Sequence, residues 1–135
     1  MATVVTAGPE HLGVLAVLDT HVTGETMLGK IAAGQVLVVL EGDVVVAGLR
    51  FGLFWDEIPF MNMLWVLEER RGRGIGSELV RAWEARMRDQ GHSEVLTSTM
   101  ANETAQEFYR KLGYVDTGAL LVPGDPLELF LRKEL

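Results

Sequence analysis

The sequence predicts one domain, residues 1–135, built on a mixed α/β sheet, and three observations support this prediction. Short segments rich in β-branched residues alternate along the chain with segments whose apolar residues recur every three or four positions. Two of the β-rich segments flank Gly42-Asp43, a dipeptide typical of hairpin turns, so the sheet is not purely parallel. The length of 135 residues suffices for one compact core and leaves no room for a second.

The first half is expected to contain four strands and two helices. Proline fits the first turn of a helix, where its missing N–H costs nothing, so Gly8-Pro9-Glu10 begins the first helix. The apolar stripe of this helix consists of Leu12, Leu15, Ala16 and Val22. A second short helix is expected from about Glu25 to Ala33. The expected strands are Thr3–Thr6, Gln35–Glu41, Val44–Phe54 and Phe60–Leu67.

The second half contains the clearest helical pattern of the chain. Its apolar side chains recur every four residues, at Ile75, Leu79, Trp83 and Met87 with Val80 beside them, and Gly91 ends the helix. Asn102 can cap a further helix, whose apolar residues are Ala105, Phe108, Tyr109 and Leu112 and which ends at Gly113. The expected strands are Glu94–Thr99, Tyr114–Leu121 and Leu127–Lys133. In the last of these, leucines alternate with Glu128, Phe130 and Arg132 on the opposite face.

Composition excludes several classes of protein. At 48% hydrophobic and 23% charged residues the chain is globular, and its net charge of −7 opposes binding to nucleic acid. It has no cysteine, so disulfides, thiolate zinc sites and a cysteine nucleophile are excluded, and its three scattered histidines lack metal-site spacing. No secretory signal is recognisable, and apolar runs such as Val36–Leu40 are too short to span a bilayer. A cytoplasmic protein without metal or membrane is expected.

The most informative segment is a glycine-rich turn between a strand and the clearest helix. Gly72, Gly74 and Gly76 alternate there, with Arg70, Arg71 and Arg73 among them. Glycines let the backbone approach a ligand closely, and the free N–H groups at a helix start attract anions, which favours a phosphate or pyrophosphate. No lysine follows as in a P-loop, and Ser77 stands where the dinucleotide fingerprint needs its third glycine. The alternative is a plain glycine-rich turn with solvated arginines.

Two motifs resemble the GNAT superfamily of N-acetyltransferases. The segment Arg71-Gly72-Arg73-Gly74-Ile75-Gly76 matches the family's Arg/Gln-x-x-Gly-x-Gly/Ala loop. The segment from Asn102 to Tyr114 looks like its Asn-x-x-Ala-x-x-Phe-Tyr-x-Lys-x-Gly-Phe/Tyr motif, at the expected distance. The order of elements is also similar, and only about residues 8–34 cannot be aligned. The resemblance implies a largely antiparallel sheet flanked by helices, with a splayed cofactor cleft.

The resemblance further implies acetyl-coenzyme A as co-substrate. Its pyrophosphate would bind the backbone of Arg71, Gly72, Arg73, Gly74, Ile75, Gly76 and Ser77. Its pantetheine arm would pair with Leu64, Trp65 and Val66 like an added strand, and the N–H of Val66 or its neighbour could stabilise an oxyanion. Asn102 is similar to the family residue that contacts the cofactor arm, a role compatible with its alternative as a helix cap.

The same resemblance gives Tyr109 the role of proton donor to the departing thiolate. A phenol with its ordinary pKa of ~10 remains protonated at neutral pH and can give its proton to a nascent thiolate. The alternative is a buried aromatic residue on the apolar stripe. For the general base, the strand before the glycine loop has no carboxylate, and the nearest acids are Asp56 and Glu57. These two could bind an ammonium group or accept its proton, or could form an exposed acidic turn.

These features predict an N-acetyltransferase in which a primary amine attacks acetyl-coenzyme A directly in a ternary complex. A non-catalytic acyl-coenzyme A-binding sensor or interaction module is the alternative, and a nucleotide-dependent enzyme is opposed by the loop spacing. The acceptor is a small molecule or an exposed amino group of a peptide, and a homodimer is compatible with the resemblance. Residues 1–69 carry two basic and nine acidic side chains, whereas residues 70–135 carry ten of each, so a cationic amine is the favoured acceptor.

Overall fold

The computed structural model describes residues 2–135 and falls into two compact units. Unit 1 contains the chain through Gly52 together with Met63–Trp83, and unit 2 contains Leu53–Asn62 together with Glu84–Leu135. The division passes through two strands and one helix, each of which contributes residues to both units.

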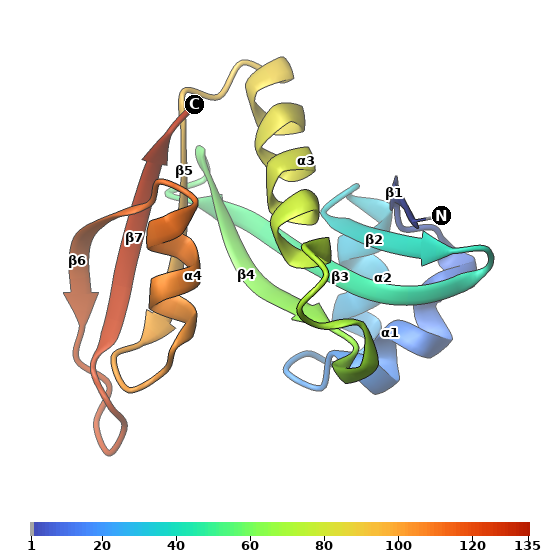
Figure 1. Cartoon of the computed structure of the whole chain (residues 1–135), viewed down its shortest axis with the longest axis horizontal. Helices are drawn as coiled ribbons and strands as arrows, with labels where there is room; N and C mark the ends of the chain where they lie inside the picture. The colour runs from blue at the N-terminus through green and yellow to red at the C-terminus, as the bar shows by residue number, and fades with distance from the viewer. Residues whose placement is uncertain (1) are drawn as a thin grey trace. The chain divides into compact units, whose positions relative to one another are not determined.

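The elements are those of a mixed α/β fold, and the fold class expected from the sequence is confirmed (Figure 1). The strands are β1 (Ala2–Thr6), β2 (Val36–Glu41), β3 (Val44–Phe54), β4 (Ile58–Val66), β5 (Glu94–Met100), β6 (Val115–Leu120) and β7 (Glu128–Glu134). The α-helices are α1 (Leu12–Leu18), α2 (Gly24–Ala32), α3 (Ile75–Asp89) and α4 (Ala105–Lys111). Hydrogen-bonded neighbours follow the order β1-β2-β3-β4-β5-β7-β6. Antiparallel ladders join β1 to β2, β2 to β3, β5 to β7 and β6 to β7, whereas β4 and β5 are parallel.

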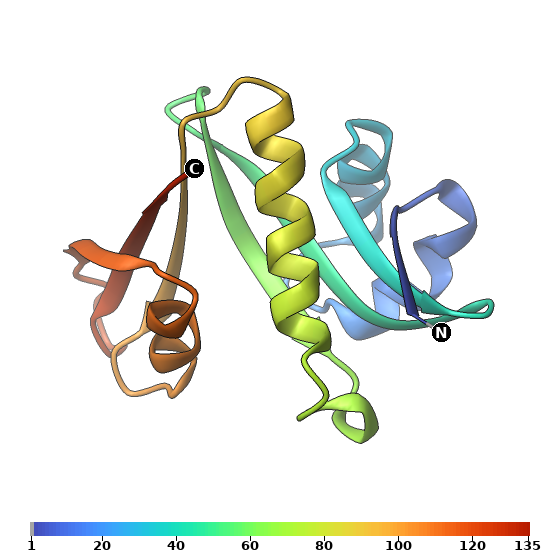
Figure 2. The same cartoon turned by 45° about the horizontal axis from the view of Figure 1, so that its top comes forward.

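In unit 1, the expected hairpin is confirmed with its two-residue turn. Glu41 pairs with Val44, and Gly42 takes the left-handed conformation (φ +61°) that the turn requires. Helices α1 and α2 cover one face of this hairpin, and the first part of α3 covers the other, as both views show (Figures 1 and 2). The strands are therefore apolar on both faces, and four consecutive residues, Val36–Val39, are buried.

The first helix differs from its prediction. A 3-10 turn at Pro9–His11 precedes α1, and α1 ends before Asp19, so Val22 lies outside the helical stripe. The physical reason is a long-range ion pair. Asp19 is extended (φ −110°, ψ 92°) and its carboxylate binds the Arg50 guanidinium in the middle of β3, Oδ2 to Nε at 2.7 Å. Because local apolar spacing carries no information about this pair, the pattern extended the helix too far.

The end of β4 is held against β3 by a close fit between Gly48 and Trp65. The Trp65 side chain packs against the apolar cluster that α1 and α2 form with β2. A Cβ atom built on Gly48 would lie 2.6 Å from Trp65 Cζ2, closer than two carbons can approach. Gly48 therefore makes room for the indole, and the Trp65 side chain packs over the Gly48 backbone.

Replacing Gly48 with alanine should consequently destabilise the protein by about 1–3 kcal/mol, the usual cost of forcing an extra methyl group into a packed core. Urea unfolding measures this change directly. The double variant Gly48→Ala/Trp65→Leu relieves the clash, and its unfolding free energy should exceed the value that adding the two single effects gives. Additive effects would show that the two residues do not interfere.

In unit 2, a three-stranded sheet β5-β7-β6 carries α4 on one face (Figure 1). Thr97 pairs with Leu131 and Leu96 with Arg132. Leu131 is fully buried, whereas Phe130 and Arg132 on the other face are half-buried, so the expected alternation is confirmed around Leu131. Leu129 is half-buried, and Leu127, which is 38% exposed, lies before the strand. β6 is exposed along its whole length and carries a register shift between Asp116 and Gly118, an irregularity common at sheet edges.

Candidate functional site

The turn between β4 and α3 has the conformation that its glycines predict. Gly72 and Gly74 both lie in the left-handed region, at φ +78° and +80°. A Cβ atom at either position would meet no neighbouring atom within 4 Å. These glycines are therefore required by backbone conformation, and the space around them is open.

The turn leads directly into the start of α3, where backbone N–H groups have no partner within the helix. The first intrahelical bond runs from the Glu78 N–H to the Gly74 carbonyl at 3.0 Å. The N–H groups of Ile75, Gly76 and Ser77 precede it and have no carbonyl of the helix to bind. α3 is 15 residues long, so its dipole adds positive potential at this end. Together these groups can bind an anion such as a pyrophosphate.

The three arginines of the turn differ in what they contact. Arg70 Nε donates to Glu41 Oε1 at 2.7 Å, and the hydrogen bond to this carboxylate raises the pKa of Arg70. Arg71 Nε donates to the Val66 carbonyl at 3.1 Å, which ties the turn to the end of β4. Arg73 is exposed. The charge of Arg70 is thus neutralised within the fold, and Arg71 and Arg73 remain as cations of the turn.

The last residues of β4 offer backbone groups and no reactive side chain. The parallel ladder with β5 consists of Phe60 paired with Leu96 and Met61 paired with Thr97, and Leu64–Val66 lie beyond its end. On the side of β3, the Leu67 N–H donates to the Val46 carbonyl at 2.9 Å. An extended segment with one edge outside a ladder can accept a further strand-like group.

In unit 2, Tyr109 lies on α4 with 7% of its surface exposed. Its ring packs edge-on against Phe108 and Tyr114, at centroid distances of 5.2 and 5.7 Å. Burial raises the pKa of Tyr109, while a hydrogen bond with Thr97 lowers it and the Glu103 carboxylate raises it. The net shift is upward, so the phenol is protonated throughout the neutral range.

Thr97 is a partner of Tyr109 that local sequence patterns did not reveal. It is 1% exposed on β5, and its hydroxyl donates to the Met61 carbonyl at 3.1 Å. Thr97 also forms the hydrogen bond with Tyr109 that lowers the pKa of this phenol. A threonine inside a strand of β-branched residues gives no local signal of this contact.

Asn102 does not cap α4, contrary to the prediction. It lies in a turn closed by the Glu103 N–H and the Met100 carbonyl, and the N-cap position is Thr104. The Gln106 side chain donates to the carbonyls of Ala101 and Glu103 at 2.7 and 2.9 Å. Asparagine is favoured at such turns because its side chain can hydrogen-bond the nearby backbone, as it also does at a helix cap. The two positions therefore look alike in sequence.

Asp56 and Glu57 lie in the turn that connects β3 to β4, before the first residue of β4. Six residues of β4, 58–63, separate them in sequence from Leu64–Val66 at the end of the same strand. Within the part of the chain described, residues 2–135, neither carboxylate forms an ion pair. Glu57 lines a polar hollow of about 380 Å³ together with His92 and Glu94. The structure does not bring these two acids together with Tyr109.

Two buried charge networks were also missed. In unit 2, the Glu84 carboxylate on α3 is 4% exposed and accepts from the Tyr114 hydroxyl at 2.7 Å and from Lys133 Nζ at 2.9 Å. This carboxylate raises the pKa of Tyr114, although burial is the larger cause. A local signal existed, because Glu84 stands four residues after Val80, on the apolar stripe. The Asp19–Arg50 pair of unit 1 gave no such signal.

Two further searches cover the described residues. Among residues 2–135, no group of three or more histidine, aspartate or glutamate side chains is arranged to hold a metal ion. Within the same range, none of the helices combines the length and the apolar character needed to cross a bilayer.

Comparison with known proteins gives a family match and many structural matches. The model of the Acetyltransferase (GNAT) family matches residues 15–114. Ard1 from Thermoplasma volcanium superposes with a TM-score of 0.86 at 19% identity, over 99% of this chain and 97% of that one.

Two further structures carry informative names. Arabidopsis thaliana Naa50 in complex with the bisubstrate analogue CoA-Ac-MVNAL has a TM-score of 0.80 at 20% identity, over 99% of both chains. The Drosophila melanogaster polyamine N-acetyltransferase has a TM-score of 0.82 at 15% identity, over the full length of both chains. No curated protein matches by sequence.

Proposed function

The chain belongs to the Acetyltransferase (GNAT) family, and from this premise we propose that it transfers an acetyl group from acetyl-coenzyme A to a primary amine. The observation that carries the proposal is the β4–α3 turn. Its two left-handed glycines and the free N–H groups at the start of a 15-residue helix suit a pyrophosphate. Acetyl-coenzyme A would supply a thioester, whose carbonyl carbon is open to attack by an amine.

The donor would be held mainly by main-chain groups. The N–H groups from Arg71 to Ser77 bind the pyrophosphate, and the Arg71 and Arg73 guanidinium groups add positive charge. Leu64–Val66 pair with the pantetheine arm as a strand would, while Asn102 contacts the same arm. The N–H of Val66 or its neighbour would donate to the thioester oxygen, on which negative charge develops as the amine attacks.

Tyr109 would supply the proton that the leaving group needs. The acceptor first loses a proton to water, because an ammonium nitrogen has no free electron pair. The neutral nitrogen then forms a bond to the carbonyl carbon, the carbon–sulfur bond breaks, and the sulfur leaves with the electron pair. The Tyr109 phenol gives its proton to this sulfur, and the proton lost by the amine passes to water and restores the phenol. A raised pKa keeps the phenol protonated before the reaction.

A cationic amine is the acceptor class that we favour. Asp56 and Glu57 carry negative charge without ion-pair partners in residues 2–135, so they attract cationic amines toward the protein. Because they do not lie with Tyr109, they do not hold the amine at the reacting centre. Relatives of this fold named for polyamine and peptide substrates are compatible with either a small amine or an exposed amino group.

The alternative is a sensor of the same fold that binds acyl-coenzyme A without chemistry. Retention of a buried, protonated Tyr109 favours the enzyme. Release of free coenzyme A thiol in the presence of a panel of amines, together with thermal stabilisation by acetyl-coenzyme A, distinguishes the two. Stabilisation without thiol release from any amine would identify the sensor, and stabilisation by NAD or ATP instead would overturn both.

Replacing Gly74 with alanine tests the turn itself. Alanine at φ +80° is strained by about 1–2 kcal/mol, and the turn is expected to relax and withdraw its N–H groups. We expect the KM for acetyl-coenzyme A to rise about tenfold or more, with the KM for the amine little changed.

Gly91→Ala is the matched control, because Gly91 has φ +94° at the other end of α3 and open space around its Cα. It should lower thermal stability as Gly74→Ala does but leave the KM for acetyl-coenzyme A unchanged. Equal effects of the two substitutions on this KM would contradict binding of the donor at the turn.

A further inference from the structure

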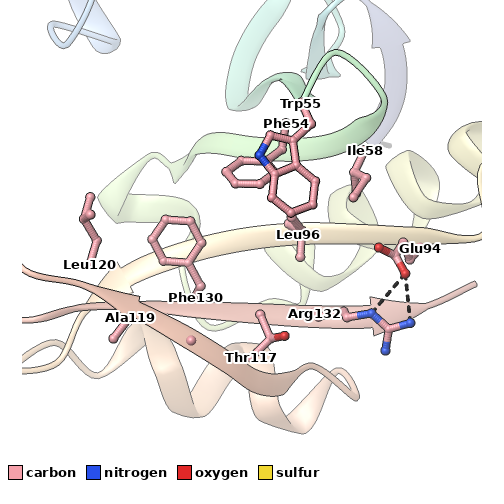
Figure 3. A pocket seen from close by; sticks show the side chains of 11 residues that line it. Phe54, Trp55, Ile58, Glu94, Leu96, Thr117, Ala119, Leu120, Phe130 and Arg132 are labelled. Atoms are coloured by element: carbon pink, nitrogen blue, oxygen red, sulfur yellow. Dashed lines mark hydrogen bonds and ion pairs between the residues drawn. The ribbon is translucent and has the colours of Figure 1, made fainter.

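Unit 2 contains an aromatic pocket that none of the proposed catalytic steps uses. It has a volume of about 620 Å³, within the usual range for small-molecule sites. Figure 3 shows the rings of Phe54, Trp55 and Phe130 around it, with Leu96 at its floor. The rings of Phe54 and Phe130 pack edge-on, with their centroids 6.3 Å apart. The pocket is therefore a preformed apolar cavity with aromatic walls.

The pocket and Tyr109 lie on opposite faces of the β5-β7-β6 sheet. Side chains alternate between faces along a strand. On β5, Leu96 lines the pocket, whereas its neighbour Thr97 contacts Tyr109. On β7, Phe130 and Arg132 line it. The pocket is thus separate from the phenol that would act in acetyl transfer.

The turn at the rim of the pocket has an unfavourable backbone conformation and carries an exposed tryptophan. Trp55 and Asp56 are the two non-glycine residues with positive φ in the part of the chain that is described, at +55° and +61°. Such a conformation is costly for a bulky residue, and 77% of the Trp55 surface is exposed. The strain holds a large aromatic side chain over an apolar cavity, where a bound molecule would cover it.

The polar surroundings of the pocket favour a cation over an anion. Arg132, the one basic residue that lines it, already donates to Glu94 at 2.8 Å and to Glu134 at 3.3 Å. The polar hollow that contains Glu57 adjoins the pocket, since both are lined by Ile58 and Glu94. The Glu57 carboxylate has no ion-pair partner within residues 2–135. An apolar cavity thus opens beside a free negative charge.

We propose that this pocket binds a small hydrophobic ammonium compound, with its apolar body among Phe54, Trp55 and Phe130 and its charged nitrogen beside Glu57. Aromatic faces attract cations, so the rings and the carboxylate act on the ligand together. A second copy of this chain fits less well, because its own Asp56 and Glu57 would approach the same carboxylates. Binding here does not depend on acetyl transfer.

Trp55 provides the direct measurement. The other two tryptophans are shielded, Trp83 fully and Trp65 in part, so a ligand in the pocket changes mainly the emission of Trp55. Titration with 2-phenylethylammonium chloride, without acetyl-coenzyme A, should give a saturable blue shift below about 10 mM. The uncharged 2-phenylethanol should bind about three- to tenfold more weakly, and putrescine, which lacks an apolar body, should cause no shift.

Two substitutions separate the charge from the apolar contact. Glu57→Gln should weaken binding of the ammonium compound to the level of the alcohol, while the exposed Glu107→Gln on α4 should not change it. Trp55→Ala, followed by calorimetry in place of fluorescence, should weaken binding about tenfold, and Leu121→Ala, an exposed apolar residue outside the pocket, should not.

Tyr109→Phe should bind the ammonium compound as the parent does, so a failure of acetyl transfer leaves this result intact. Absence of saturable binding, equal affinity for the amine and the alcohol, or a concentration-dependent dimer that buries Trp55 would each overturn the proposal. A crystal structure with 2-phenylethylammonium bound elsewhere would do the same.

Discussion

Replacing Asp19 with alanine is expected to lower the free energy of unfolding by about 3–5 kcal/mol, the largest effect on stability that the fold predicts. Asp19 and Arg50 are 1% and 8% exposed, and their side chains meet at 2.7 and 3.4 Å. Removing the carboxylate leaves the Arg50 guanidinium buried without its partner, and a buried charge without a partner is far costlier than the loss of the attraction alone. Urea unfolding followed by circular dichroism measures the change.

A second variant distinguishes the loss of the attraction between the two charges from the cost of leaving a buried charge without a partner. Asp19→Ala/Arg50→Met removes both charges and keeps an unbranched apolar chain inside β3, so it should recover most of the lost stability. The exposed pair Arg110–Asp116, at 2.9 Å, is the matched control, and Asp116→Ala should give no measurable change. If Asp19→Ala unfolds as Asp116→Ala does, the pair does not stabilise the fold.

This ion pair also marks where prediction from sequence failed. The hairpin at Gly42-Asp43 and the stripe of α3 were predicted correctly because their signals lie within a few residues of the structure they specify. The end of α1 depends instead on Arg50, 31 residues away from Asp19. Tertiary contacts of this kind override local spacing, and one sequence contains no pattern that announces them.

The candidate site divides in the same way. The positive φ values of Gly72 and Gly74 could be predicted because glycine is itself the signal for that conformation. The partner of Tyr109 could not be predicted, because Thr97 lies on a separate strand. Threonine is common in strands for reasons of packing, so its presence there does not indicate a contact. The aromatic pocket was equally hidden, since Phe54, at the end of β3, and Phe130, on β7, meet only within the folded unit 2.

The largest effect on turnover is expected for Tyr109→Phe. We expect kcat to fall about 10²- to 10³-fold while the KM for acetyl-coenzyme A changes little, because the substitution removes one proton donor and keeps the ring. Steady-state assays with a saturating amine measure the ratio of the two kcat values. Unchanged kcat would remove Tyr109 from the mechanism and favour the sensor.

Tyr114→Phe is the matched control, since it removes the only other tyrosine hydroxyl of the chain. That hydroxyl donates to the buried Glu84 carboxylate at 2.7 Å and has no part in the proposed reaction. The variant should therefore lose about 1–3 kcal/mol of stability and retain kcat, the converse of Tyr109→Phe. Loss of turnover in both variants would point to a structural role for Tyr109.

The direction of the Tyr109 pKa shift predicts the pH dependence. Because burial raises the pKa of this phenol above its ordinary value of about 10, deprotonation of Tyr109 should not reduce kcat below about pH 10. The same shift affects stability: above pH 10 the unfolded chain loses the proton while the folded chain keeps it, so stability declines as pH rises further. Tyr109→Phe should lessen that decline. A fall in kcat near pH 8 that Tyr109→Phe abolishes would require a lowered pKa and would contradict the buried, protonated phenol.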